Sequence, residues 1–166
     1  MKQTNRRGKR KTLLILILLA IVLALCFIFG NSLLDGERSG EMSASVLDFL
    51  HPVLRPAAEL FSREPVTEES LHHLVRKLAH FIEFAVLACF SSLLLLRLCG
   101  RWRTPYLGCL LFCMLLAAVT DEFIQTFTGR GSSVRDVVLD FCGALTGMAL
   151  TFLLSALIRR RGKHKA

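Results

Sequence analysis

The sequence predicts an all-α fold, an integral membrane bundle of four transmembrane helices with both termini in the cytoplasm. Of the 166 residues, 53% are apolar and only 20% are charged, which is too apolar for a typical soluble domain and excludes a disordered chain. The apolar residues fall into four blocks, each near the roughly 20 residues that a helix needs to cross a bilayer. Because lipid offers backbone groups no hydrogen-bond partners, these blocks are expected to be helical.

The four helices form one transmembrane domain at residues 13–158, between basic cytoplasmic tails at 1–12 and 159–166. The first block carries no charge, whereas the other three include polar residues. Thr67 is placed to cap the second helix, because two glutamates follow it where the helix dipole favours acids. We expect the helices at about residues 13–30, 67–97, 105–127 and 136–158.

Lysines and arginines set the expected orientation. They cluster in the two tails and in the connection between the second and third helices, with no acidic residue among them. The positive-inside rule therefore places these three segments in the cytoplasm. Since the basic residues gather at the ends of the apolar blocks rather than on one face, the net charge of +8 does not indicate a nucleic-acid partner.

Two features near the outer side leave alternatives open. The first block follows a basic start, as in a cleavable signal peptide, but its apolar run at 13–29 is longer than the usual stretch of about 7–15 residues, which favours a retained helix. In the first outer loop, residues 42–61 place apolar side chains at roughly helical spacing, interrupted by two prolines. This pattern suits an interfacial helix on the outer leaflet and equally suits a loop packed over the bundle.

Polar residues inside the predicted helices mark a candidate site. An ionisable side chain costs roughly 2.5–3.5 kcal/mol at a helix centre, so such residues persist where they pair, face water or perform a function. Their spacing places them on one stripe of each of the last three helices, near the outer end of the bundle. Together with the short loop between the last two helices, they comprise Arg76, His80, Glu83, Asp121, Glu122, Gln125, Arg130, Arg135, Asp136 and Asp140. The topology predicts a polar pocket that opens to the outer leaflet.

A simpler interpretation is that arginines neutralise the acids. Arg76 and Arg135 would then form internal salt bridges with nearby carboxylates. Such bridges explain one buried pair, whereas six or more ionisable groups at one depth favour a functional site. Gly143 and Gly147 form a small-xxx-small pair, which predicts close helix packing rather than ligand contact.

Two chemistries fit these residues, and a binding protein is the first hypothesis. Arginines would hold the phosphates of a lipid-linked headgroup, and acids would bind sugar hydroxyls or amines. The binding set is then Arg76, Gln125, Arg130, Arg135, Asp136 and Asp140.

The second hypothesis is a membrane enzyme, a hydrolase or transferase that modifies a lipid or its headgroup. Such an enzyme would either bind a divalent cation or use His80 as its general base. The sequence does not require a cofactor. Its catalytic set is His80, Glu83, Asp121 and Glu122. A transporter ranks last, because the inner half of each span carries no acidic or basic residue.

Four polar motifs carry a family resemblance. Residues 76–83 read Arg-Lys-Leu-Ala-His-Phe-Ile-Glu, and residues 121–127 read Asp-Glu-Phe-Ile-Gln-Thr-Phe, followed by Gly129-Arg130 and Asp136-Val137. In the same order, they resemble the R-K-x-x-H-F-x-E, D-E-x-x-Q-x-F, G-R and D-V segments of the VanZ-like family of bacterial integral membrane proteins. Asp140 departs from the pattern, since asparagine is common there, and it adds a negative charge that needs a partner.

The resemblance implies a multi-pass protein of the bacterial cytoplasmic membrane. It also implies a link to glycopeptide resistance, because the member that names the family is associated with low-level teicoplanin resistance. The implied partners are membrane lipids, together with a lipid-linked cell-wall precursor or a lipoglycopeptide.

Overall fold

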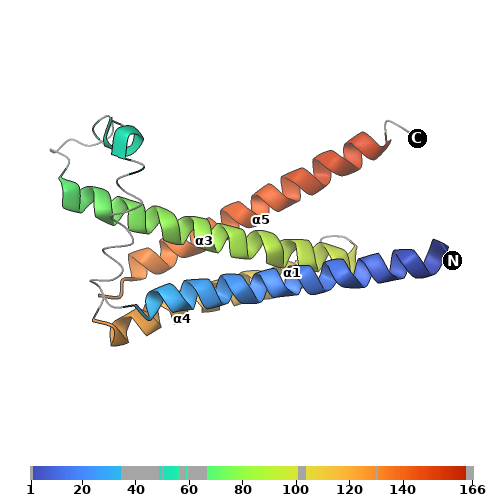
Figure 1. The fold of residues 1–166 in the computed structure, drawn as a ribbon, viewed down its shortest axis with the longest axis horizontal. Helices are drawn as coiled ribbons and strands as arrows, with labels where there is room; N and C mark the ends of the chain where they lie inside the picture. The colour runs from blue at the N-terminus through green and yellow to red at the C-terminus, as the bar shows by residue number, and fades with distance from the viewer. Residues whose placement is uncertain are drawn as a thin grey trace.

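In the computed structural model of the protein, the described residues are 2–34, 49, 51–56, 59, 67–100, 104–129 and 131–163. They form four long helices, which lie lengthwise in a bundle (Figure 1). The helices are α1 (Lys2–Ser32), α3 (Glu68–Cys99), α4 (Thr104–Phe127) and α5 (Val134–Lys163). No strand occurs within the described ranges, so the prediction of an all-α fold is confirmed.

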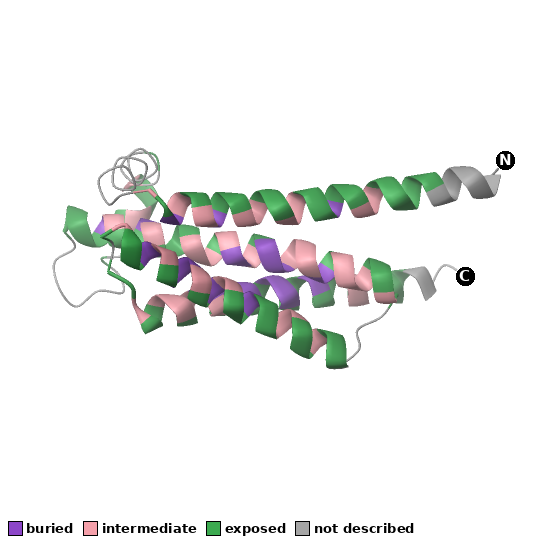
Figure 2. Cartoon of the chain, turned by 90° about the horizontal axis from the view of Figure 1, so that it is seen from below, coloured by how far each residue is buried: buried purple, intermediate pink, exposed green. Residues whose placement is uncertain are grey.

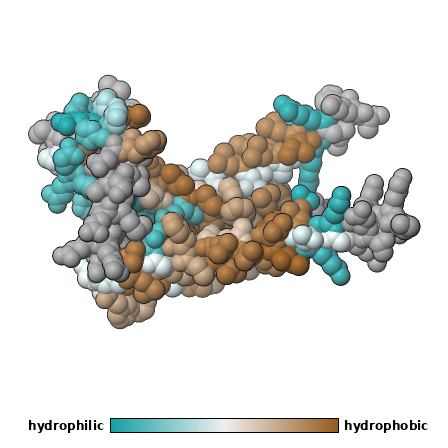
Figure 3. Space-filling model, viewed as in Figure 1, coloured by the Kyte–Doolittle hydropathy of each residue, from teal (hydrophilic) through white to brown (hydrophobic). Residues whose placement is uncertain are grey.

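All four helices are long and apolar enough to cross a membrane. The candidate spans are Gly8–Ser32, Glu68–Cys99, Pro105–Phe127 and Val134–Arg161. Exposed positions line the outward faces of the helices (Figure 2), and hydrophobic residues form a band between more hydrophilic ends (Figure 3). Because large apolar side chains cover these outward faces, the chain is a multi-pass membrane protein.

The ends of α3 follow from local sequence. Thr67 is the N-cap, as predicted: its Oγ1 accepts a hydrogen bond from the backbone N–H of Ser70, while the Thr67 N–H donates to Ser70 Oγ. Gly100 ends the helix in the left-handed conformation, with φ 69°, which glycine adopts without a steric penalty. Both ends lie close to the predicted boundaries of 67 and 97.

The tightest helix contact is between α3 and α5. A Cβ atom added to Gly143 would overlap the backbone carbonyl oxygen of Phe81, and one added to Gly147 would overlap that of Ala85. The two glycines therefore let the backbones approach at successive turns, as the small-xxx-small pattern predicts. Below the polar region, this contact continues into the apolar core.

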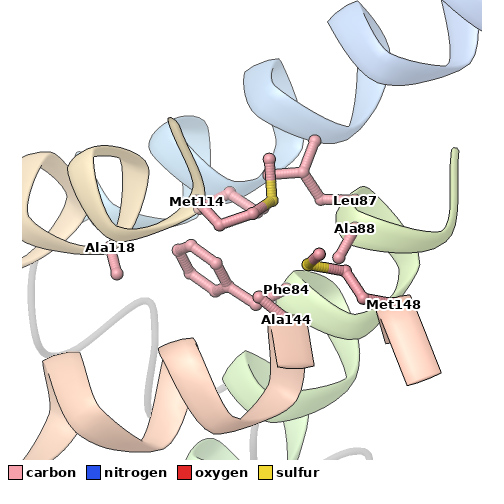
Figure 4. Packing of buried hydrophobic residues seen from close by; sticks show 8 residues of the cluster. Phe84, Leu87, Ala88, Met114, Ala118, Ala144 and Met148 are labelled. Atoms are coloured by element: carbon pink, nitrogen blue, oxygen red, sulfur yellow. The ribbon is translucent and has the colours of Figure 1, made fainter. Parts of the chain in front are cut away.

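The apolar core joins all four helices. Figure 4 shows Phe84, Leu87 and Ala88 of α3 packing with residues of α4 and α5. The neighbours from those two helices are Met114, Ala118, Ala144 and Met148. Ile28 of α1 belongs to the same cluster and is 1% exposed. Because α1 contributes a core residue, it is an integral helix of this bundle.

The N- and C-terminal ends lie at the same end of the bundle (Figures 1 and 2). There, Arg10 of α1 donates to the carbonyl oxygen of Arg97 at 3.2 Å, and Arg159 of α5 donates to that of Gly100 at 2.7 Å. Cationic side chains thus satisfy carbonyl groups at the C-terminus of α3, where the helix dipole favours positive charge. The assignment of this end to the cytoplasm stays a prediction.

Part of the predicted outer loop packs on the bundle. Residues 51–56 are helical, Leu54 packs against the buried Leu71 and Val75, and His51 Nε2 lies 3.4 Å from Glu68 Oε1. Val53 remains 70% exposed on this segment. The segment therefore docks on α3 while presenting an apolar side chain outward, and its position at the outer leaflet stays a prediction.

Candidate functional site

Polar residues of α3, α4 and α5 meet around one cavity at the end of the bundle opposite the termini. The cavity has a volume of about 290 Å³. It is lined by His73, Arg76, Lys77, His80, Glu122, Gln125, Gly131, Asp136, Leu139 and Asp140. Three separate polar stripes in the sequence are thus brought to one place.

His80 lies between two buried aspartates. Its Nδ1 is 3.5 Å from Oδ2 of Asp121 on α4 and 3.9 Å from Oδ1 of Asp140 on α5. Both aspartates are 0% exposed, and one ligand atom from each of the three side chains lies within 4.8 Å of the others. Ligands bound about 2.1 Å from one cation lie roughly 3–4 Å apart, so this trio has the donor types and approximate spacing of a metal site.

The two aspartates have different environments. Asp121 accepts a hydrogen bond from Ser32 Oγ at 2.6 Å on Oδ1 and one from Gln125 Nε2 at 3.0 Å on Oδ2. Asp140 has no hydrogen-bond partner for either carboxylate oxygen among the described residues. A buried carboxylate without a donor is costly. Of the three side chains, Asp140 is therefore the one whose carboxylate a bound cation would stabilise most.

Glu122 links the cavity to the start of α5. Its Oε1 accepts from Gln125 Nε2 at 3.1 Å, and its Oε2 accepts from the backbone N–H of Ser133 at 2.8 Å. Ser133 Oγ in turn accepts from the N–H of Arg135, as an N-cap side chain does. The orientation of the Glu122 carboxylate and the turn into α5 are thus fixed together.

Cationic side chains lie on the wall of the cavity contributed by α3. Lys77 Nζ forms an ion pair with Asp136 Oδ1 at 3.0 Å, linking α3 to α5. The Nε atom of Arg76 is buried and has no hydrogen-bond partner in the part of the chain that the structure describes. Asp136 thus has Lys77 as an ion-pair partner, a cation that the simpler interpretation of these charges did not include.

Comparison with known proteins identifies the family. The family model described as VanZ/LLP1 matches residues 15–155. The chain belongs to the VanZ/LLP1 family. It is also 30% identical over 87 residues to the uncharacterized protein YJR112W-A of Saccharomyces cerevisiae, a match that covers 46% of this chain and 76% of the yeast protein. No solved structure matches the chain.

The VanZ/LLP1 fold brings most of the predicted site residues to the cavity or directly behind it. Glu83 lies on the side of α3 that faces α1, where its Oε1 accepts from Asn31 Nδ2 at 3.2 Å. It also lines an apolar groove of about 450 Å³ between α1 and α3. Arg135 is exposed and does not line the cavity, and Arg130 lies outside the described residues.

Sequence reasoning missed the contribution of α1 to the site. Asn31 and Ser32 reach Glu83 and Asp121 from the end of a helix whose apolar block carries no charge. The available signal was a pair of small polar residues where the first apolar block ends. Lys77 also lines the cavity without having been predicted as a site residue, although it stands within the motif at 76–83.

Proposed function

We propose that this VanZ/LLP1 protein is a membrane hydrolase or transferase that acts on the phosphorylated headgroup of a lipid or lipid-linked precursor. In this proposal, His80, Asp121 and Asp140 hold a divalent cation. The observation that carries the proposal is the convergence of these three side chains around the fully buried Asp140 carboxylate, which lacks a hydrogen-bond donor among the described residues.

The energetics of the buried acid favour a cation at this position. A charged side chain inside a membrane protein is retained where it pairs or performs a function, and the His80 imidazole is the group that lies near Asp140, with Nδ1 at 3.9 Å from Oδ1. A divalent cation would supply the missing charge and a bond to the unsatisfied oxygens. One imidazole nitrogen and two carboxylates are donors that suit Mn²⁺ or Zn²⁺.

The cationic wall supports a phosphate as the ligand. Arg76 and Lys77 line the same cavity as His80, about one helical turn away along α3. Guanidinium groups bind phosphate through paired hydrogen bonds, and buried Arg76 Nε has no protein acceptor within the described ranges. A headgroup phosphate held by these side chains would lie beside the His80–Asp121–Asp140 trio.

The residues around the cavity can be assigned roles in hydrolysis. When bound, the cation supplies Lewis-acid polarisation of a phosphoryl oxygen. Water attacks phosphorus, its oxygen forms the new bond, and the bond from phosphorus to the leaving oxygen breaks. Glu122 lines the cavity in a fixed orientation, so we assign it to accept the proton from water and return it to the leaving oxygen. In a transferase, an acceptor hydroxyl replaces the water.

A second candidate function is binding without reaction. Arg76 on α3 and Asp140 on α5 line one cavity, which suits a headgroup that carries both a phosphate and an amine or sugar hydroxyls. A lipid-linked cell-wall precursor of the bacterial cytoplasmic membrane has these groups. Holding it would shield it from a membrane-anchored antibiotic, and this is the route by which the protein would contribute to teicoplanin-type resistance.

One experiment separates the two functions. Purified protein is incubated with a bacterial lipid extract, with Mn²⁺ or with EDTA, and headgroup release is followed by mass spectrometry. The enzyme proposal predicts release that requires the cation and is lost in Asp140→Asn, while Glu69→Gln, which changes an exposed acid of α3, retains it. Co-purification of an intact lipid without release, together with teicoplanin protection of an expressing host, would instead support the binding protein.

A further inference from the structure

The end of α1 takes part in the polar site through Ser32. This residue is 0% exposed, and its hydroxyl donates to Asp121 Oδ1 at 2.6 Å. A hydrogen bond of this length from a hydroxyl to a carboxylate is charge-assisted and strong. Thr128 Oγ1 also donates to the Ser32 carbonyl oxygen at 3.2 Å. Two hydrogen bonds of Ser32 therefore join the end of α1 to α4 and to the residue that follows it.

This hydrogen bond determines which oxygen of Asp121 faces His80. Ser32 occupies Oδ1, while Oδ2 lies 3.5 Å from His80 Nδ1 and accepts from Gln125. The two carboxylate oxygens are thus held by donors from two different helices, Ser32 of α1 and Gln125 of α4. Rotation of the carboxylate would break both hydrogen bonds and move Oδ2 away from His80.

We infer that Ser32 is a positioning residue for a divalent cation held by His80, Asp121 and Asp140, an inference that rests on the proposed function. Ser32 does not line the cavity and acts through Asp121. Hydrogen bonds to ligating carboxylates orient them, and their loss typically weakens metal affinity about 10–100-fold. The first helix, which lies outside the polar motifs of the other three, is therefore part of the site.

The test measures Mn²⁺ binding to the purified full-length protein by isothermal titration calorimetry, with no substrate present. Ser32→Ala is expected to weaken the affinity about 10–100-fold, whereas Ser32→Thr keeps the hydroxyl and is expected to bind nearly as well as the wild type. Ser92→Ala is the matched control, because Ser92 is also a 0% exposed helical serine but lies about three helical turns beyond His80 on α3. It is expected to leave the affinity unchanged.

A second readout distinguishes positioning from general stability. Thermal unfolding is measured with and without Mn²⁺, and a merely structural role would lower the Tm of the metal-free protein while leaving the Mn²⁺ affinity intact. That result would overturn the inference about Ser32 and leave the proposed function standing. A wild type that binds no Mn²⁺ would overturn both. If Ser32→Ala does not accumulate, Ser32→Cys, a weaker donor, is expected to bind with intermediate affinity, and wild-type affinity would overturn the inference.

Discussion

Gly143 of α5 lies so close to Phe81 of α3 that a Cβ atom at position 143 would overlap the Phe81 carbonyl oxygen. Phe81 directly follows His80, and Gly143 is less than one helical turn from Asp140. The contact that lets the two backbones approach therefore also sets the separation of two residues of the site. Packing and chemistry depend on the same pair of helices.

Gly143→Ala is expected to separate α3 from α5 and to destabilise the protein by about 1–3 kcal/mol, the usual cost of overpacking. Because His80 and Asp140 move apart with the helices, Mn²⁺ affinity is expected to fall as well. Thermal unfolding and calorimetry of the purified variant check both effects. Gly108→Ala is the control, since nothing lies within 4 Å of a Cβ added there; equal loss in the two variants would contradict this account of the contact.

Asp140→Asn is expected to raise the stability of the metal-free protein and to abolish the stabilisation that Mn²⁺ gives the wild type. The reason is that the substitution removes a buried carboxylate without a hydrogen-bond donor among the described residues, an unsatisfied group that costs about 1–3 kcal/mol or more. The measurement is the Tm of each protein in EDTA and in Mn²⁺. A variant that is less stable than wild type in EDTA would show that Asp140 is satisfied within the protein alone.

Arg76→Lys is expected to weaken binding of the phosphorylated headgroup while leaving the fold intact. Lysine keeps the positive charge but cannot form the paired hydrogen bonds of a guanidinium. We expect KM to rise about tenfold, equivalent to about 1.4 kcal/mol, with kcat little changed. Arg160→Lys, an exposed arginine near the end of α5, serves as the control. A lower kcat at unchanged KM would place Arg76 in the chemical step instead.

Orientation in the membrane is tested with reporter fusions. Both termini lie at one end of the bundle (Figure 1), and the basic residues gathered there predict that this end is cytoplasmic. Green fluorescent protein fused after Ala166 should therefore fluoresce, and alkaline phosphatase at the same position should be inactive. An alkaline phosphatase sandwich fusion at Ser132 should be active. The reverse pattern at both sites would invert the topology.

Much of the fold and part of the site follow from sequence periodicity. The spacing of Arg76 from His80, and of Asp121 from Gln125, fixes which residues share a helix face, so three converging stripes were predictable. The rotation of each helix about its own axis relative to its neighbours was not predictable from this spacing. Glu83 turns toward α1, where it accepts a hydrogen bond from Asn31, since α3 packs on both α1 and α5.

Ion pairing also depends on tertiary context. Lys77 rather than Arg76 pairs with Asp136, a choice between adjacent cations that no spacing rule decides. The start of α1 at Lys2 rather than near residue 13 is instead a local effect, since lysine and arginine favour helix. Hydropathy locates the part of a helix that meets lipid, and the backbone continues past it.

Pulsed electron paramagnetic resonance of Mn²⁺ bound to the purified protein reports whether His80, Asp121 and Asp140 hold a divalent cation. We expect a nitrogen coupling from a histidine ligand that is lost in His80→Gln and retained in His73→Gln, which changes another histidine that lines the same cavity. Absence of bound Mn²⁺ from the wild type, or a nitrogen coupling that survives in His80→Gln, would contradict this expectation.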